Sequence, residues 1–251
     1  MGRREPRRPA DSPPARPDGS TVLYGRNAVH EALRGPRAVE QVWATEGAAR
    51  EPWLRGARVR GASAEELERR CGSPEHQGIC AEVAPYRYAD AGALLAREDA
   101  LIVALDELQD PQNLGAVCRT AECAGATGVV IPERRSAEVT PAVCKASAGA
   151  VEHLAIARVR NLADFLLEAR RAGAWSYGAD GGARVGYAQP DYRGKVVLVM
   201  GSEGRGLRPR VARSCDELIA LPLRGRIASL NVSAAASALL YEIARQRGAQ
   251  A

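Results

Sequence analysis

The sequence predicts an α/β protein with a small first domain and a larger second domain built on a mostly parallel sheet. Short apolar runs alternate with amphipathic helical segments along most of the chain. The alternation is interrupted at residues 86–98, which read as a linker carrying a short helix. In the second part, the runs ALIVAL and VVLVM are apolar at every position, which is typical of strands buried on both faces of a sheet.

The first 20 residues differ from everything that follows. They are rich in Pro, Arg and Asp and contain almost no aliphatic side chains, so they cannot bury enough apolar surface to order themselves. We predict a disordered basic tail over residues 1–20.

The first domain is predicted over residues 21–85. TVLY reads as a short strand, and the helix that follows begins near Arg26 and ends at Gly35. AVEQVWAT and GICAEVAPY read as two further strands. Between them, SAEELERRCG predicts a short helix with Ser63 as N-cap and Glu66 completing a capping box. The result is a small α/β domain.

The second domain is predicted over residues 99–251 as a longer alternation. Its expected strands are ALIVALDEL, TGVVIP, EHLAIARV, AWSYGAD, KVVLVM and ELIALP. Its expected helices are NLGAVCRTAECAGA, TPAVCKASAGA, NLADFLLEARRAG and a C-terminal helix that Ser229 or Asn231 begins.

Composition limits the possible functions. The net charge of +5 comes from 35 Lys plus Arg against 30 Asp plus Glu, a balance compatible with a nucleic-acid partner but equally with a GC-rich genome. The six cysteines form no C-x-x-C pair and accompany no histidine cluster, so we expect no metal site and read them as small buried hydrophobes. Without a run of ~18 apolar residues or a secretory signal, the chain is expected to be cytoplasmic, with no membrane partner.

Unusual residues follow three of the predicted strands, where ligands bind in parallel sheets. After ALIVALDEL, Asn113 is positioned to cap a helix whose apolar stripe excludes Arg119; by itself, Arg119 would be read as a solvated surface residue. After KVVLVM, the loop GSEGRGL fits neither a Rossmann fingerprint nor a P-loop. After ELIALP, Ser229 and Asn231 precede the last helix, where an ordinary cap is the simplest interpretation.

Taken together, DPQNLGAVCRTAECAGATGVV, VLVMGSEGRGL and IALPLRGRIASLNVSAAASALL resemble the three ordered motifs of the SpoU (TrmH-like) branch of the SPOUT RNA methyltransferases. In addition, YGRNAVHEAL and EHQGICAEV resemble the RNA substrate-binding domain of the 23S rRNA guanosine 2′-O-methyltransferase subgroup. The resemblance covers nearly the whole chain except the tail. It implies S-adenosyl-L-methionine as methyl donor, an obligate homodimer, and a C-terminal trefoil knot formed by the segments around 201–207 and 221–231.

The resemblance also implies roles for individual residues. The arginine that the family is proposed to use for activating the ribose hydroxyl falls on Arg119. Because guanidinium is essentially always protonated, we assign it to orienting the hydroxyl and stabilising negative charge. Glu203 is expected to pair with an arginine. The predicted catalytic residues are Arg119, Asn113, Glu203, Asn231 and Ser229; the cofactor-binding residues are Gly201, Leu221 and Leu230; the RNA-binding residues are Arg26 and Gln77.

The sequence therefore predicts an enzyme that methylates a ribose 2′-oxygen in rRNA, with a guanosine of 23S rRNA as the leading target. Methylation of tRNA or of another rRNA site, including the antibiotic-resistance type, uses the same chemistry and stays open. An RNA-binding or ribosome assembly factor without catalysis is the alternative from a different class.

Overall fold

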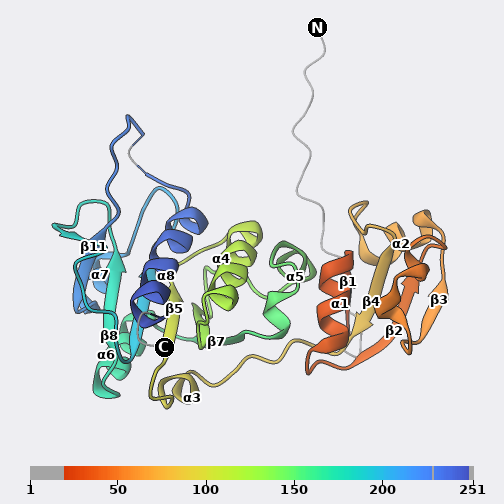
Figure 1. The fold of residues 1–251 in the computed structure, drawn as a ribbon, viewed down its shortest axis with the longest axis horizontal. Coiled ribbons are helices and arrows are strands. Elements are labelled where there is room, and N and C mark those ends of the chain that lie inside the picture. The colour runs from red at the N-terminus through yellow and green to blue at the C-terminus, as the bar shows by residue number, and fades with distance from the viewer. Residues whose placement is uncertain (1–19, 228, 249–251) are drawn as a thin grey trace, which may run out of the picture. The chain divides into compact units, whose positions relative to one another are not determined.

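The computed structural model describes residues 20–227 and 229–248, and the chain divides after Pro85 into two compact units (Figure 1). Apart from Ser20, the predicted tail lies outside the described residues. Ser20 itself is buried, and its Oγ donates a hydrogen bond to Glu82 Oε1 at 3.1 Å. It therefore belongs to the first unit.

The first unit is a four-stranded sheet with the strand order β1-β4-β2-β3. Its strands are β1 (Thr21–Tyr24), β2 (Val39–Ala44), β3 (Val59–Gly61) and β4 (Ile79–Val83). Its helices are α1 (Arg26–Arg34), α2 (Ala64–Cys71) and the short 3-10 turns η1 (Ala48–Arg50) and η2 (Pro52–Leu54). The sequence predicted β1, β2, β4, α1 and α2 but not the two 3-10 turns or β3. β3 is short and largely exposed and therefore shows no apolar alternation.

The capping box predicted for α2 forms only in part. Ser63 Oγ accepts the backbone N–H of Glu66 at 3.2 Å, as predicted. The Glu66 carboxylate, however, accepts hydrogen bonds from the Arg70 guanidinium one turn later, at 2.6 and 3.0 Å. The Glu66 side chain therefore pairs with Arg70 one turn along the helix, instead of accepting the backbone N–H of Ser63 as a complete capping box requires.

The second unit is a seven-stranded sheet with the order β7-β6-β5-β10-β8-β11-β9, in which every neighbouring pair is parallel. The strands are β5 (Leu101–Leu105), β6 (Gly128–Pro132), β7 (Ala155–Val159), β8 (Trp175–Ala179), β9 (Val185–Gly186), β10 (Val196–Met200) and β11 (Glu217–Ala220). The helical elements are α3 (Ala91–Leu95), α4 (Pro111–Cys123), α5 (Pro141–Ala146), η3 (Ala150–Glu152), α6 (Leu162–Arg171), α7 (Pro209–Ser214) and α8 (Val232–Gly248). The parallel α/β architecture predicted from the sequence is confirmed.

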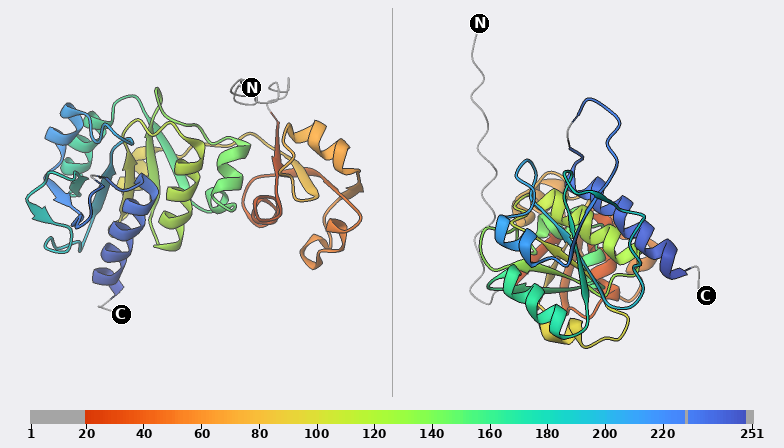
Figure 2. Two further views of the ribbon diagram at one scale, coloured as in Figure 1. Left: turned by 90° about the horizontal axis from the view of Figure 1, so that it is seen from above. Right: turned by 90° about the vertical axis from the view of Figure 1, so that its left-hand side faces the viewer.

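Helices cover this sheet, and β5 and β10 are buried along their whole length, as their apolar runs predicted. Ile102 of β5 and Val197 of β10 pack in one cluster with Phe165 of α6 and Val211 of α7. α4 and α8 pack against each other and lie side by side in the separate views of Figures 1 and 2. Leu114, Val117, Cys118 and Ala121 are the buried stripe of α4, as predicted.

The place of β10 in the sheet determines where the site can form. It lies between β5 and β8, so the segments following β5, β8 and β10 all leave the sheet at its carboxyl edge. The segment following β11 leaves at the same edge because β11 runs parallel to β8. The trefoil knot implied by the resemblance stays a prediction.

Five cysteines are buried, as expected of small hydrophobes, but Cys123 at the end of α4 is exposed. Within residues 20–227 and 229–248, no cluster of three potential metal ligands is found. Over the same residues, no helix has both the length and the apolar character to span a membrane.

Candidate functional site

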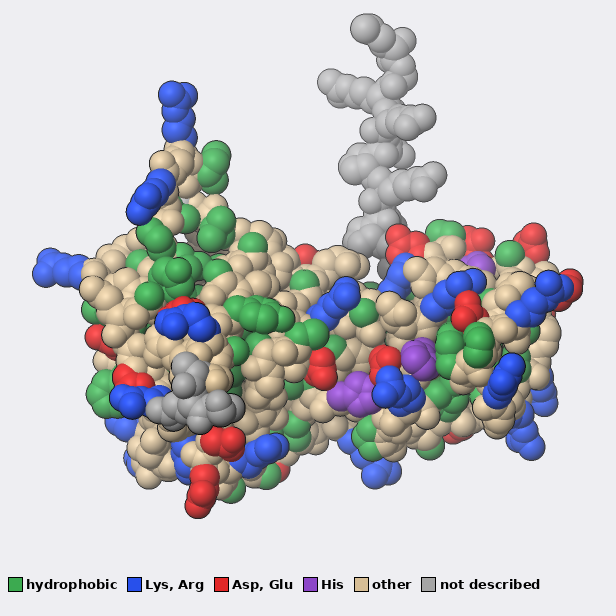
Figure 3. All heavy atoms as spheres, viewed as in Figure 1, with side chains coloured by type: hydrophobic (Ala, Val, Ile, Leu, Met, Phe, Trp, Pro, Cys, Tyr) green, Lys and Arg blue, Asp and Glu red, His purple; other side chains and the backbone are tan. Residues whose placement is uncertain are grey.

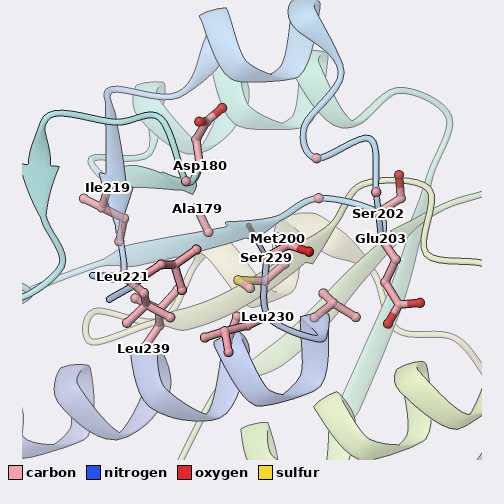
Figure 4. Close-up of a pocket in the computed structure, with 17 residues that line it drawn as sticks. Ala179, Asp180, Met200, Ser202, Glu203, Ile219, Leu221, Ser229, Leu230 and Leu239 are labelled. Carbon is pink, nitrogen blue, oxygen red and sulfur yellow. The ribbon is translucent and has the colours of Figure 1, made fainter. Parts of the chain in front are cut away.

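A pocket of about 350 Å³ opens at the carboxyl edge of the seven-stranded sheet (Figure 4). Its walls come from the end of β8 and the two residues after it (179–181), the end of β10 and the loop after it (200–204), residues between Ile219 and Val232, and the first turns of α8. This volume is within the range of small-molecule sites. Two of the three motifs singled out in the sequence, those after β10 and β11, therefore meet around one cavity.

The three residues predicted to bind a cofactor, Gly201, Leu221 and Leu230, all line this pocket. Ser229 lines it as well. Leu230 is 49% exposed at the rim, and Ile227 is 76% exposed on the loop leading to it. In Figure 3, basic and hydrophobic side chains stand together on this protruding loop before α8.

The loop from Gly201 to Leu207 closes tightly on itself. Ser202 and Gly206 exchange two backbone hydrogen bonds, at 3.1 and 2.9 Å. A Cβ placed on Gly201 would lie 2.2 Å from the carbonyl carbon of Gly206, so only glycine permits this approach. Gly204 and Gly206 have φ values of 76° and 65°, in the left-handed region that favours glycine. The glycine spacing thus reflects the conformation of the loop.

Three of the predicted catalytic side chains meet in one hydrogen-bonded cluster beside the pocket. Glu203 Oε1 accepts from Asn113 Nδ2 at 2.8 Å and from Asn231 Nδ2 at 2.7 Å. Asn231 Nδ2 also lies 3.0 Å from Asn113 Oδ1, to which it donates. Residues from α4, from the loop after β10 and from the start of α8 are thereby tied together. We refer to Asn113, Glu203 and Asn231 as the amide–carboxylate cluster.

Two details of this cluster correct the sequence interpretation. Asn113 does not cap α4: Asp110 does, by accepting the N–H of Gln112 at 3.1 Å, with Pro111 as the first helical residue. Asn113 is instead a buried residue of the first turn, and its side chain is free to reach Glu203. The expected pairing of Glu203 with an arginine is also wrong, because among the described residues Glu203 contacts the two amides instead.

Asn231 serves the last helix as well as the cluster. Its Oδ1 accepts the backbone N–H of Ser233 at 2.9 Å and the Ser233 hydroxyl at 2.6 Å. Asn231 is therefore the residue that begins α8, whereas Ser229 lies before it in the pocket wall. One side chain both starts the helix and fixes the carboxylate.

Arg119 lies about two turns along α4 from the cluster and is exposed. Within the described ranges, its guanidinium has no hydrogen bond or ion pair. The neighbouring Thr120 is engaged differently, with its Oγ1 3.0 Å from Ser237 Oγ of α8. Arg119 is thus available to a ligand, while the helix that carries it is fixed against α8.

A buried ion pair that the sequence did not reveal anchors the far end of the 201–207 loop. The Asp106 side chain is fully buried; its Oδ2 accepts the backbone N–H of Arg208 at 2.8 Å, and its Oδ1 accepts from the guanidinium at 2.6 and 2.7 Å. Glu107 adds a second carboxylate 3.1 Å from the same guanidinium. The hydrogen bond to Asp106 raises the pKa of Arg208 above its ordinary value. The loops after β5 and β10 are therefore linked by charge.

In the first unit, the two predicted RNA-binding residues contact each other. Gln77 Oε1 accepts the backbone N–H of Arg26 at 2.9 Å and so caps α1, whose N-cap residue Gly25 offers no side chain. The Arg26 guanidinium lies 2.8 Å from Glu51. Both residues thus have structural partners, and contact with RNA stays a prediction for them.

Comparison with known proteins now gives the family. The sequence model of the SpoU rRNA methylase family matches residues 100–241, more than half of the chain. The chain belongs to the SpoU family. A second sequence model, described as RNA 2′-O ribose methyltransferase substrate binding, matches residues 22–89, which include the four strands of the first unit except Thr21, the first residue of β1.

Individual relatives and a solved structure agree with this membership of the SpoU family. An uncharacterized tRNA/rRNA methyltransferase of Synechocystis sp. is 40% identical over 96% of this chain, which spans 66% of that protein. The Bacillus subtilis protein YacO, named as a TrmH family tRNA/rRNA methyltransferase, is also 40% identical, over 90% of this chain and 95% of its own. The crystal structure of the SpoU methyltransferase AviRb from Streptomyces viridochromogenes with AdoMet matches with a TM-score of 0.78 and 26% identity, covering 92% of both chains.

The SpoU family uses S-adenosylmethionine, and the lining of the pocket fits that molecule. Leu221, Leu230 and Leu239 offer apolar surface of the kind that an adenine ring packs against. Glycine backbone at 201 and 204 leaves N–H and C=O groups open to polar atoms. The described lining includes two acidic side chains, Asp180 and Glu203, and no basic one, which suits a sulfonium cation.

Sequence reasoning missed two residues of this SpoU site. Asp180 follows β8 and lines the pocket, and Asp106 follows β5 and holds Arg208. Both stand directly after a strand that the sequence predicted, the position that marked the other motifs. The acidic residue at a strand end was therefore an available signal in each case.

Proposed function

We propose that this SpoU family protein transfers a methyl group from S-adenosylmethionine to a ribose 2′-oxygen of rRNA, with a guanosine of 23S rRNA as the target. The observation that carries the proposal is the amide–carboxylate cluster beside the pocket. Arg119, which has no partner among the described residues, lies on α4, the helix that contributes Asn113 to this cluster. The match of residues 22–89 to an RNA 2′-O ribose methyltransferase substrate-binding model supports the choice of acceptor atom.

In this proposal the pocket holds the cofactor through Gly201, Leu221 and Leu230, with the leucines against its apolar part. When bound, S-adenosylmethionine supplies an electrophilic methyl group on a positively charged sulfur. The protein must hold the acceptor oxygen in line with that methyl group and exclude competing water. The exposed apolar side chains of Leu230 and Ile227 at the rim support the exclusion of water once RNA covers them.

Arg119 binds the acceptor strand in this scheme. Its exposed guanidinium presents five donors that suit a phosphate and a neighbouring hydroxyl. Positive charge there stabilises the negative charge that develops on the 2′-oxygen. Since Arg119 has no partner among the described residues, it loses no protein contact when it binds RNA.

The first unit favours rRNA over tRNA as the acceptor, because transfer-RNA relatives of this branch tend to lack such a module. Arg26 and Gln77 are the proposed contacts of this unit, acting within a homodimer. The proposal also includes 23S rRNA as the target. It divides the chain into a substrate-binding domain over residues 21–85 and a methyltransferase domain over residues 99–251.

The proposal is tested by mapping ribose methylation in ribosomal and transfer RNA from cells with and without the gene. The expected result is loss of one 2′-O-methylated guanosine in 23S rRNA, restored by the wild-type gene. Loss of a tRNA methylation would instead assign the enzyme to tRNA. Calorimetry with S-adenosylmethionine separates the non-enzymatic alternative, because an inactive assembly factor is expected not to bind it.

A further inference from the structure

The proposed reaction leaves one chemical requirement without a residue. A ribose 2′-hydroxyl must lose its proton when its oxygen becomes an ether, and Arg119 cannot accept it because guanidinium is already protonated. Of the described residues that line the pocket, Asp180 and Glu203 are the titratable ones. Each therefore has to be considered as the proton acceptor.

Glu203 is held in a way that leaves one oxygen open. Its Oε1 accepts from both amides of the amide–carboxylate cluster, at 2.7 and 2.8 Å. Its Oε2 has no hydrogen-bond partner among the described residues, and the side chain is exposed at the pocket wall. Two directional donors on one oxygen thus fix the direction in which the other oxygen presents its lone pairs.

Asp180 is placed differently. Its Oδ1 accepts the N–H of Gly182 at 2.7 Å, which holds the turn after β8. In Figure 4 the Asp180 carboxylate lies on the opposite side of the pocket from the Glu203 carboxylate and points away from the cavity. Glu203, by contrast, is hydrogen-bonded to α4, the helix that carries Arg119. Of the two carboxylates, Glu203 is thus the one tied to the helix that carries Arg119.

We propose that Glu203 Oε2 accepts the proton of the ribose 2′-hydroxyl during methyl transfer, an inference that rests on the proposed function. The 2′-O–H bond breaks and its proton moves to Oε2. An electron pair of the 2′-oxygen forms the new bond to the methyl carbon, and the electron pair of the breaking carbon–sulfur bond returns to sulfur. The products are a 2′-O-methyl ether, a neutral thioether and a protonated carboxyl group, so charge and atoms balance.

A carboxylate is basic enough for this step. As the carbon–oxygen bond forms, electron density leaves the attacking oxygen, so the hydroxyl proton becomes more acidic as the transfer proceeds. The base therefore needs correct position more than high basicity, and a positioned carboxylate is a competent general base. Arg119 remains charged throughout and continues to hold the acceptor strand.

The test is Glu203→Gln in the full chain, because glutamine keeps an acceptor at the position of Oε1 and replaces Oε2 by an NH₂ group. We expect the single-turnover rate with the mapped rRNA substrate to fall by about 100-fold or more. The dissociation constant for S-adenosylmethionine, measured by calorimetry, is expected to change less than about twofold, since Oε1 still holds the cluster. Glu168→Gln, at an exposed position on α6, is the matched control and is expected to keep the wild-type rate.

A second variant tests whether the loss of rate comes from the missing base or from a disturbed amide–carboxylate cluster. Glu203→Ala removes the whole carboxylate, and added formate is expected to restore part of its rate, whereas chloride at the same ionic strength does not. A Gln variant with the wild-type rate, an equal loss of cofactor affinity, or an Ala variant that formate does not rescue would each overturn the inference. Failure of the proposed function looks different, because the wild-type protein would then methylate no RNA.

Discussion

Removal of the buried carboxylate of Asp106 is the most direct test of how the 201–207 loop is held. Asp106→Ala deletes three hydrogen bonds to Arg208, at 2.6, 2.7 and 2.8 Å, from a side chain that is 0% exposed. Breaking a buried ion pair costs about 3–5 kcal/mol. The Arg208 side chain is 42% exposed and keeps Glu107, so the lower end, about 3 kcal/mol, is expected here.

The measurement is differential scanning calorimetry, with Arg210→Ala as the control. Arg210 pairs with Asp164 at 2.5 Å, but both side chains are more than half exposed, so that pair contributes at most about 1 kcal/mol. The melting temperature of the second unit should fall by roughly 6–12 °C for Asp106→Ala and by less than about 4 °C for the control. Equal shifts in the two variants would refute the reasoning from burial. Cofactor affinity should fall for Asp106→Ala alone.

Three further predictions follow from single residues. Arg119→Ala should reduce the single-turnover rate by about 100- to 1,000-fold without changing stability or cofactor affinity, because the side chain has no partner among the described residues; an equal loss of affinity in calorimetry would contradict this. Gly201→Ala should weaken S-adenosylmethionine binding by at least about tenfold, since its Cβ would lie 2.2 Å from the Gly206 backbone; unchanged binding would show that the loop can adapt. Gln77→Ala should destabilise the first unit by about 1 kcal/mol in urea unfolding, from the lost cap of α1; Gln77→Gly loses the same cap but relieves the strain of φ 55°, worth about 1 kcal/mol, and should be more stable than Gln77→Ala.

Local pattern was sufficient for most of the fold. The apolar runs of β5 and β10 and the stripe of α4 each depend on a burial pattern that the residues themselves carry. The sequence pattern did not predict β3, because an exposed strand shows no alternation of apolar and polar residues. The pattern also gave the wrong N-cap for α4, because Asp110 and Asn113 both precede its apolar stripe. Proline favours the first helical position, so Pro111 identifies Asp110 as the cap.

The sequence analysis named the three residues of the amide–carboxylate cluster but not their contacts with one another. The motifs indicated Asn113, Glu203 and Asn231 as separate residues, and their meeting depends on the sheet order, which joins strands distant in the chain. An arginine partner was expected for Glu203. The structure instead surrounds it with amides, because Asn231 is fixed by its role at the start of α8. Such contacts between distant segments have no local sequence signal.

The central position of β10 also governs the order in which the chain can fold during synthesis. β5, β6 and β7 can pair as soon as they have been made, but both neighbours of β8, namely β10 and β11, come later in the chain. A nascent chain that ends before Val196 therefore has an unpaired β8 and an open apolar edge at β5. Since such distant pairing slows folding, the second half of the sheet assembles late, and prematurely ended chains are expected to be prone to aggregation.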